Sequence, residues 1–465
     1  MNRIRSVFLF LLLFMILAAT SSPHATATAN AAVAASPGET RSITLDEAVR
    51  IGLERSRSLQ IARLDRDMAS QKIRQTWSEV LPQITSGFTY TRTLKPSVLL
   101  LPSSPFIPSG FLETSSDNAG RATLDVRQPL FNLSAIAGIN AAGIVRKMSE
   151  EAYRNTEAAV VADIKISYFD ALISTDQLHL IEQSIARWEQ SRKDTRAMFR
   201  QGVAADIDTL KAFLSVENLR PDLIQAQSRV AITLTKLKNS MGLPADSSVV
   251  LSGKLELSSK SYPLDIATAY REALDSRPDL RMLDLQVKAE SQKINAARAE
   301  RFPVISAFGK LETQTAFDDK IRPSDSVWPA SSSVGLQFTL PIFTSYRISA
   351  QVEQARIAQL QTRTRLEDLK ANVRAEIEVR VLNYKEAQKR IEVQSTTISV
   401  AERSYKISLL RFKEGIGSRL ELTDAELQLN KAKTNYLQAI YDYLVAGTQL
   451  EKALGRLGVQ VASKG

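Results

Sequence analysis

Two long stretches without proline constrain this chain more than any other feature of its sequence. Residues 133–201 contain no proline, and their only glycines, Gly138 and Gly143, lie near the start. Residues 344–412 contain neither proline nor glycine. Because an α-helix rises about 1.5 Å per residue, each stretch predicts a single helix of roughly 100 Å. A typical globular helix has about 11 residues, so the chain is expected to be mainly α-helical and elongated.

The two stretches belong to a duplicated pattern. A glycine follows the end of each stretch, and another closes the next predicted helix at the same interval. These pairs, separated by 213 residues, are Gly202 with Gly415 and Gly242 with Gly455. Because the interval is constant over this region, we interpret the chain as an internal repeat.

Each repeat predicts a helix, a β-hairpin, the long helix and a second helix, in that order. In the first repeat the flanking helices are expected at residues 43–81 and 206–241, with a discontinuity at Pro221. Both flanking helices should run antiparallel to the long helix and together cover its length. The predicted divisions are a first repeat at residues 43–242, a linker at 243–262, a second repeat at 263–458 and a short tail at 459–465.

The hairpins are predicted from alternation of apolar and polar residues. Ile84, Phe88 and Tyr90 fall on one face of an extended strand, whereas Thr85 and Thr89 fall on the other. Proline-rich and serine-rich loops separate the strands of each hairpin. Such strands are typical of an outer-membrane hairpin, although an ordinary surface hairpin shows the same alternation. The strands are expected at about 82–93, 120–131, 302–315 and 332–343.

The N-terminus has the features of an export signal. Arg3 and Arg5 precede an apolar run at residues 7–19, and small residues follow. The run is shorter than the roughly 20 residues that span a bilayer as a helix. We therefore expect a signal peptide at residues 1–29, cleaved near Ala29; an uncleaved anchor is the alternative.

The composition argues against an enzyme. The chain has no cysteine, which excludes disulfides and thiolate chemistry and leaves no thiol for a lipid anchor. His24 lies in the leader, so only His179 remains downstream. No nucleotide-binding or metalloprotease motif is present, and we expect no cofactor and no metal site. The net charge of +10 comes from mixed charges typical of solvated helices. This charge gives only weak support to nucleic-acid binding.

Closure of the predicted sheet requires more than one chain. Two hairpins supply only four strands, and open sheet edges cannot face lipid. Three chains would supply twelve strands, within the range of known membrane barrels. The sequence itself does not determine the number of copies, and cyclic symmetry is the usual solution.

Residues 43–458 resemble the TolC-type outer membrane efflux proteins. The resemblance rests on the duplicated pattern and on motifs in matching order: Pro129-Leu130-Phe131, Pro341-Ile342-Phe343, Arg277-Pro278-Asp279-Leu280 and Asn435-Tyr436-Leu437. It implies a homotrimer with a shared 12-stranded β-barrel in the outer membrane and a trimeric α-barrel that extends into the periplasm. It also implies docking to a periplasmic adaptor (membrane fusion) protein and an inner-membrane pump.

The resemblance also implies where the functional residues lie. Adaptor contacts are expected at the two tips, and acidic residues after each tip are expected to line the periplasmic entrance and to favour cations. The tip residues are Gly202, Val203, Ala204, Gly415, Ile416 and Gly417, and the acidic residues are Asp208, Glu421 and Asp424. Glycine is also needed wherever a chain reverses at positive φ, and Glu421 fits a capping box with Ser418.

One departure from the family pattern concerns closure of this entrance. The family's best-described member uses an arginine and a tyrosine near the second tip, where this chain has Gly417 and Phe412. Asp208 matches the acceptor of that contact but lacks the same partner. Arg411 and Arg419 are nearby candidates for a replacement.

Taken with the family resemblance, the sequence predicts a passive outer-membrane exit duct of a tripartite efflux or type I secretion system. The alternative is a periplasmic coiled-coil adaptor or scaffold without a pore. Such a scaffold would contain helical hairpins but would not require two amphipathic strand pairs.

Overall fold

The computed structural model describes residues 41–95, 97–101, 110–113, 116–253, 255, 262, 265–319 and 326–457. The chain divides into two units, Met1–Arg41 and Ser42–Gly465, and the second contains nearly all of the described residues. The expected signal peptide and the expected tail at 459–465 lie outside the described residues, as do parts of the loop at 94–119 and of the linker at 243–262.

Two long helices, α4 and α9, dominate the second unit. Helix α4 covers Leu133–Arg200, and Asn132 caps it by accepting hydrogen bonds from the amides of Ser134 and Ala135. Helix α9 covers Arg347–Lys413. With 68 and 67 residues, each helix is roughly 100 Å long.

Helix α9 begins three residues later than the sequence pattern indicated. We expected a helix from residue 344, but Ser345 and Tyr346 have φ values of 48° and 65°. Left-handed residues of this kind cannot continue a right-handed helix. They form a turn between the sheet and α9. The sequence contains no sign of this turn, because neither glycine nor proline marks it.

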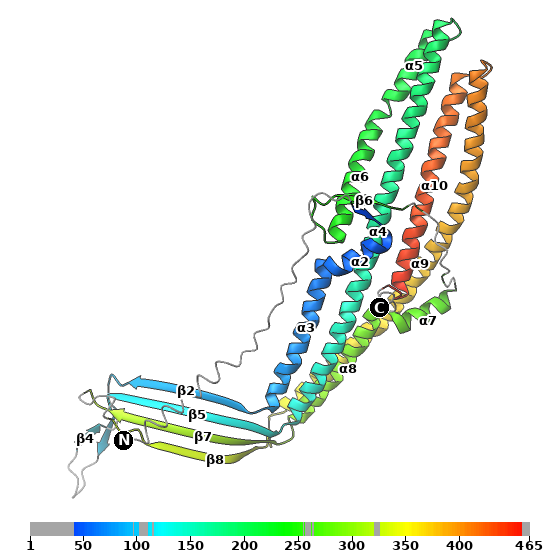
Figure 1. Cartoon of the computed structure of the whole chain (residues 1–465). Helices are drawn as coiled ribbons and strands as arrows, with labels where there is room; N and C mark the ends of the chain where they lie inside the picture. The colour runs from blue at the N-terminus through cyan, green and yellow to red at the C-terminus, as the bar shows by residue number, and fades with distance from the viewer. Residues whose placement is uncertain are drawn as a thin grey trace. The chain divides into compact units, whose positions relative to one another are not determined.

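Shorter helices pack along both long ones (Figure 1). Helix α4 contacts α3 (Arg57–Trp77), α5 (Asp206–Glu217) and α6 (Arg220–Ser240) of its own half. Helix α9 contacts α7 (Ile266–Ser276), α8 (Pro278–Ala299) and α10 (Arg419–Ala453). Because α8 and α10 also pack on α4, the two halves share one helical body.

The helix expected at residues 43–81 is interrupted. The structure has strand β1 (Arg41–Ile43), helix α2 (Leu45–Arg55), helix α3 and a 3-10 turn, η1 (Ser78–Val80). The break lies at Ser56, whose ψ of 125° is extended. No proline follows Ser56, so the prediction of one continuous helix was wrong. In the other flanking helix, the break between α5 and α6 lies next to Pro221, as expected.

The four long strands form one antiparallel sheet in the order β2-β5-β7-β8. Strands β5 and β7 pair along most of their length, with Leu124 opposite Leu311 and Asp125 opposite Lys310. The two hairpins of the chain are therefore joined side by side. The strands are β2 (Gln83–Arg92), β5 (Asn118–Phe131), β7 (Val304–Phe317) and β8 (Ala330–Thr339).

Two smaller sheets accompany the main one. Strands β3 (Val98–Leu101) and β4 (Gly110–Glu113) form a short hairpin within the segment that the sequence indicated only as a loop. Strand β1 pairs with β6 (Val249–Leu251), and the hydroxyl of buried Tyr168 lies 3.1 Å from the carbonyl oxygen of Ile43. This contact joins the start of the first repeat to the middle of α4.

The main apolar core lies where the halves meet. Helices α4, α9 and α10 each contribute a buried stripe, represented by Ile164, Ile377 and Leu450. Buried residues of α2, α6 and α7 pack against them. Among the helices of the described ranges, none has an apolar stretch of the length that would cross a membrane.

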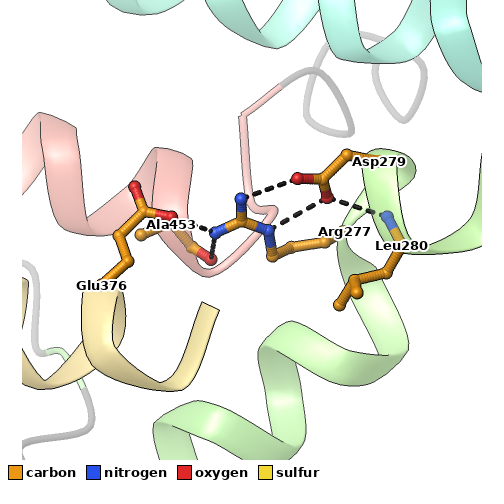
Figure 2. A network of polar contacts seen from close by, with 5 residues as sticks. All are labelled: Arg277, Asp279, Leu280, Glu376 and Ala453. Carbon is orange, nitrogen blue, oxygen red and sulfur yellow. Dashed lines mark hydrogen bonds and ion pairs between the residues drawn. The ribbon is translucent and has the colours of Figure 1, made fainter. Parts of the chain in front are cut away.

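Arg277 connects three helices at the edge of this core (Figure 2). It lies between α7 and α8 with a ψ of 123°, because a residue before proline avoids the helical region. Its guanidinium donates two hydrogen bonds to Asp279, at 3.0 and 2.8 Å. It also donates to Glu376 of α9 at 2.7 Å and to the carbonyl of Ala453 in α10 at 3.2 Å.

We predict that this cluster makes stability depend on acid pH. Burial tends to raise the pKa of Asp279, but the hydrogen bonds and charge of Arg277 outweigh burial and lower it. A lowered carboxyl pKa contributes stability above the unfolded value of about 4, and that contribution is lost as pH falls through the folded pKa.

Asp279→Asn should therefore reduce thermal stability at neutral pH and flatten its loss between pH 5 and stronger acid. Thermal unfolding followed by circular dichroism across this range provides the measurement. Asp284→Asn, which removes an exposed pair with Lys288, serves as the control and should behave like the parent protein. Equal acid sensitivity of the Asp279 variant and the parent would contradict the prediction.

Candidate functional site

The two helical tips are built by the same hydrogen bonds. At the first tip, the amides of Gly202 and Val203 bond to the carbonyls of Phe199 and Met198. At the second, the corresponding bonds link Gly415 and Ile416 to Phe412 and Arg411, each 213 positions later. Gly202 and Gly415 have φ values of 72° and 73°. The turns are thus matched residue by residue.

The predicted docking residues differ in how far they protrude. Val203 and Ile416 are 72% and 71% exposed, and a Cβ atom on Gly202 or Gly415 would meet no neighbour within 4 Å. Ala204 is only partly exposed. Each tip thus presents one large apolar side chain to solvent on a glycine turn.

The structure gives a steric reason for glycine at position 417 that the sequence did not reveal. A Cβ atom at this position would lie 2.9 Å from Cβ of Arg411 and 3.0 Å from its carbonyl carbon. A side chain at this position would force Arg411 to shift. Glycine therefore fits this turn without displacing Arg411.

The predicted acidic residues lie on α5 and α10 just after the tips. Glu421 and Asp424 are exposed. The amide of Glu421 donates to the Oγ of Ser418 at 3.1 Å, so the predicted N-cap is present. Its carboxylate lies 3.8 Å from Nε of Arg411. The buried face of α10 carries Leu422 and Leu429 instead, which leaves the two acidic groups accessible to solvent.

Arg419 joins the second tip to the first. Its Nη1 donates to the Oγ1 of Thr195 at 2.7 Å, and its guanidinium lies 6.0 Å from the ring centroid of Trp188. Both partners are buried residues of α4. Burial lowers the pKa of Arg419, and the charge of Asp208 on α5 partly opposes that effect.

A buried ion pair that the sequence did not predict lies next to these contacts. Glu426 of α10 is 2% exposed, and its Oε1 accepts a hydrogen bond from Nε of Arg187 in α4 at 2.7 Å. Nη2 of Arg187 also donates to the amide oxygen of Asn430 at 2.8 Å. Burial, together with the negative charge of Glu426, raises the pKa of Tyr405 in α9 to about 12. Glu426 therefore stands where α4, α9 and α10 meet.

The sequence does contain a signal that Glu426 is buried and paired. It occupies the same helical stripe as Leu422 and Leu429, where an apolar residue is expected. A charged residue in an apolar stripe requires a partner. The identity of that partner is not readable, because Arg187 lies 239 positions away in the chain.

The contacts of α10 near the tips differ toward its two neighbours. Toward α9 they combine apolar packing of Leu429 and Ala432 on Ala401 with ion pairs such as Glu421–Arg411. Toward α4 they include hydrogen bonds to Arg187 and Thr195, which are directional.

Comparison with known proteins places the chain in a family. A family model described as outer membrane efflux protein matches residues 49–243 and 269–456. The chain belongs to that family. The matched ranges include both long helices, all four strands of the main sheet and both tips.

Relatives of known name extend over most of the chain. A probable efflux pump outer membrane protein, TtgC of Pseudomonas putida, is 24% identical over 417 residues, which cover 88% of this chain and 82% of the relative. The outer membrane protein TolC of Escherichia coli is 20% identical over 408 residues, covering 85% and 79%.

Solved structures share the fold. The outer-membrane channel OprN aligns with a TM-score of 0.71 at 19% identity, covering 88% of this chain and 89% of OprN. The CmeC outer membrane channel of Campylobacter jejuni aligns with a TM-score of 0.72 at 17% identity, covering 88% and 85%. The mainly helical fold with its four-stranded sheet is therefore that of outer membrane channels.

We predict that the Arg187–Glu426 pair stabilises the contact between the two hairpins. Glu426→Gln leaves the half-buried guanidinium without its carboxylate, and the expected loss is about 2 kcal/mol. Hydrogen exchange of the α9 and α10 tips should consequently become faster. Glu421→Gln is the control, because its carboxylate is exposed and 3.8 Å from its cation. Equal exchange rates in the two variants would contradict a stabilising role.

Proposed function

We propose that the protein is a passive exit duct of the outer membrane, through which an inner-membrane pump of a tripartite efflux or type I secretion system moves its substrates. Family membership and the names of relatives such as TtgC support the efflux role. The observation that carries the proposal is the continuity of sheet and helices. Strand β5 ends at Phe131 and α4 begins at Leu133, while β8 ends at Thr339 and α9 begins at Arg347. Strands β5 and β8 thus lead into the two long helices, and strands β2 and β7 follow shorter ones.

The apolar face of the sheet is suited to lipid. The register aligns Ile84, Val126, Gly309 and Val334 across the four strands on one face. Val334, Leu336 and Phe338 of this face are exposed. Such a face is costly in water and favourable in a bilayer.

The opposite face carries charges. Arg121 lies 2.7 Å from Glu312, and Lys310 lies 2.6 Å from the same carboxylate. Asp125 is opposite Lys310 in the register. A sheet with one lipid-facing side and one charged side is typical of the wall of a water-filled barrel.

Closure of this wall supports assembly of several copies. In the order β2-β5-β7-β8, the outer edges of β2 and β8 have no strand partner among the described residues. Open edges cannot face lipid, so copies must pair edge to edge. Three copies of this four-stranded sheet would form a closed 12-stranded barrel, and the helices would continue it as a trimeric α-barrel into the periplasm.

The tips form the periplasmic entrance in this proposal. Gly202, Val203 and Ala204 at one tip and Gly415, Ile416 and Gly417 at the other would contact the adaptor protein. Asp208, Glu421 and Asp424 would line the aperture; Glu421 and Asp424 are exposed on α10. The role is that of a conduit, without enzymatic chemistry or a cofactor.

A pore-free periplasmic scaffold is less well supported, because it would not need an exposed apolar sheet face. Cell fractionation separates the two functions. A duct should be recovered in the outer membrane with heat-modifiable migration, whereas a scaffold should be released from the periplasm by salt.

We predict that the purified protein forms channels in planar bilayers whose cation preference depends on the aperture acids. Removing like charges from a constriction lowers the local cation concentration. The Glu421→Ala, Asp424→Ala double variant should show a reversal potential shifted toward zero in a salt gradient. Glu414→Ala is the control, because Glu414 is an exposed acidic residue in the turn of the second tip. Absence of channels in the parent protein would contradict the duct proposal. Unchanged selectivity in the double variant would contradict only the assignment of Glu421 and Asp424 to the aperture.

A charged residue at the second tip should block docking of the adaptor. Ile416→Glu places a carboxylate where the proposed interface needs an apolar side chain, so co-purification of the adaptor should be lost while the duct still assembles. Val250→Glu changes an exposed apolar residue of β6, away from the tips, and should retain the adaptor. Parental yield of adaptor with Ile416→Glu would show that this tip is not the docking site.

A further inference from the structure

The charged face of the main sheet is arranged in layers that cross its four strands. The layer nearest the helices consists, from β2 to β8, of Gln83, Arg127, Phe308 and Gly335. Side chains alternate between the two faces along a strand, so this layer lies on the face opposite to Val334. Gln83 is the first residue of β2, which places the layer at the end of the sheet that continues into the helices.

Arg127 is the uncompensated charge of this face. Farther along the strands, Arg121 and Lys310 lie 2.7 and 2.6 Å from the carboxylate of Glu312. Asp125 is opposite Lys310 in the register. Arg127 is exposed, and its guanidinium has no hydrogen bond or ion pair with any residue that the structure describes. The net positive charge of the face is therefore located at Arg127.

Phe308 provides an apolar surface in the same layer. It is directly opposite Arg127 in the register and is 40% exposed. A Cβ atom on Gly335 would lie 2.8 Å from Cζ of Phe308, so the aromatic ring lies over this glycine. The ring thus leans toward β8, on the side away from β5, and leaves the guanidinium of Arg127 uncovered.

We propose that this layer is a binding site for aromatic anions, such as arylsulfonates and arylcarboxylates, that pass through the duct. The inference rests on the proposed function, because the charged face lines a water-filled lumen only in a closed barrel. A guanidinium can donate two parallel hydrogen bonds to a sulfonate or carboxylate, and an aromatic solute can pack on the ring of Phe308. Directly opposed residues of antiparallel strands have Cα atoms about 5 Å apart, so one small molecule can contact both groups.

This site acts independently of the acidic residues proposed at the aperture. Helix α4 lies between the sheet and the first tip and is roughly 100 Å long. Charges in water are screened over about 8 Å at physiological salt. The aperture acids would therefore affect the entry of ions, whereas Arg127 would affect their passage into the barrel.

Block of single channels by naphthalene-2-sulfonate tests the site. With the purified protein in planar bilayers at pH 7, we expect this sulfonate to reduce the current of the parent channel as its concentration rises. Methanesulfonate has the same charge but no ring, and should need at least a tenfold higher concentration for half-block. Arg127→Gln should raise the half-blocking concentration of naphthalene-2-sulfonate at least about tenfold, because a hydrogen bond to a charged group is lost.

The matched control removes the same charge from the same face. Arg121→Gln alters a residue about 20 Å farther along β5 that is paired with Glu312, and should change the half-blocking concentration by less than twofold. Gly335→Ala tests the aromatic part, because the added methyl group would displace the ring of Phe308. It should weaken block while the current without the sulfonate stays at the parental level.

The possible failures are distinguishable. If the parent forms channels but naphthalene-2-sulfonate does not block them, or methanesulfonate blocks them equally well, the proposed site is wrong while the duct proposal stands. Equal effects of Arg121→Gln and Arg127→Gln would contradict it in the same way. Arg127→Lys keeps the charge but not the planar fork, and should also weaken block, so the result does not depend on assembly of one variant. If the parent forms no channels, the proposed function fails and the inference fails with it.

Discussion

The length of α4 is the constraint on which the rest of the structure depends. A helix of 68 residues is not stable in water by itself, because helical stability in proteins comes mainly from packing of an apolar face. Helices α3, α5 and α6 cover α4 from its own half of the chain, and α8 and α10 cover it from the other. The two repeats consequently cannot form independent domains. They share one helical body with α4 as the common element.

The chemistry of this shared contact changes along α4. In the middle, Ile164 lies in a large apolar core with α9 and α10, and packing there tolerates few alternatives. Near the tip, Arg187 and Thr195 hold α10 through hydrogen bonds. A buried ion pair gains little net stability, but it is costly when one partner is removed, so it favours one geometry. The helical body is therefore held by apolar packing in its middle, and near the tips hydrogen bonds hold α10 to α4.

The duplicated design leaves two kinds of surface unsatisfied in a single chain. At the sheet, β5 pairs with β7 and thereby joins the repeats, but among the described residues β2 and β8 have no partner on their outer edges. At the tips, α10 covers α4, but α5 and α9 keep apolar residues such as Phe213 and Val400 at the surface. In the proposed ring, edge-to-edge pairing of copies would supply the strand neighbours that β2 and β8 lack.

Local sequence determined the long helices, the alternating strands and the matched glycine turns, because helix propensity, strand periodicity and positive φ are properties of neighbouring residues. The tip residues and exposed acids were likewise located from the sequence, through the duplicated turns and the family resemblance. Other features were not predicted by these patterns: the break at Ser56, the left-handed turn before α9 and the β3–β4 hairpin. The Arg187–Glu426 pair is the clearest case. Glu426 alone marks only a charge in an apolar stripe, and its partner is decided by how α10 packs on α4 in the tertiary structure, since residues 239 positions apart have no local rule that pairs them.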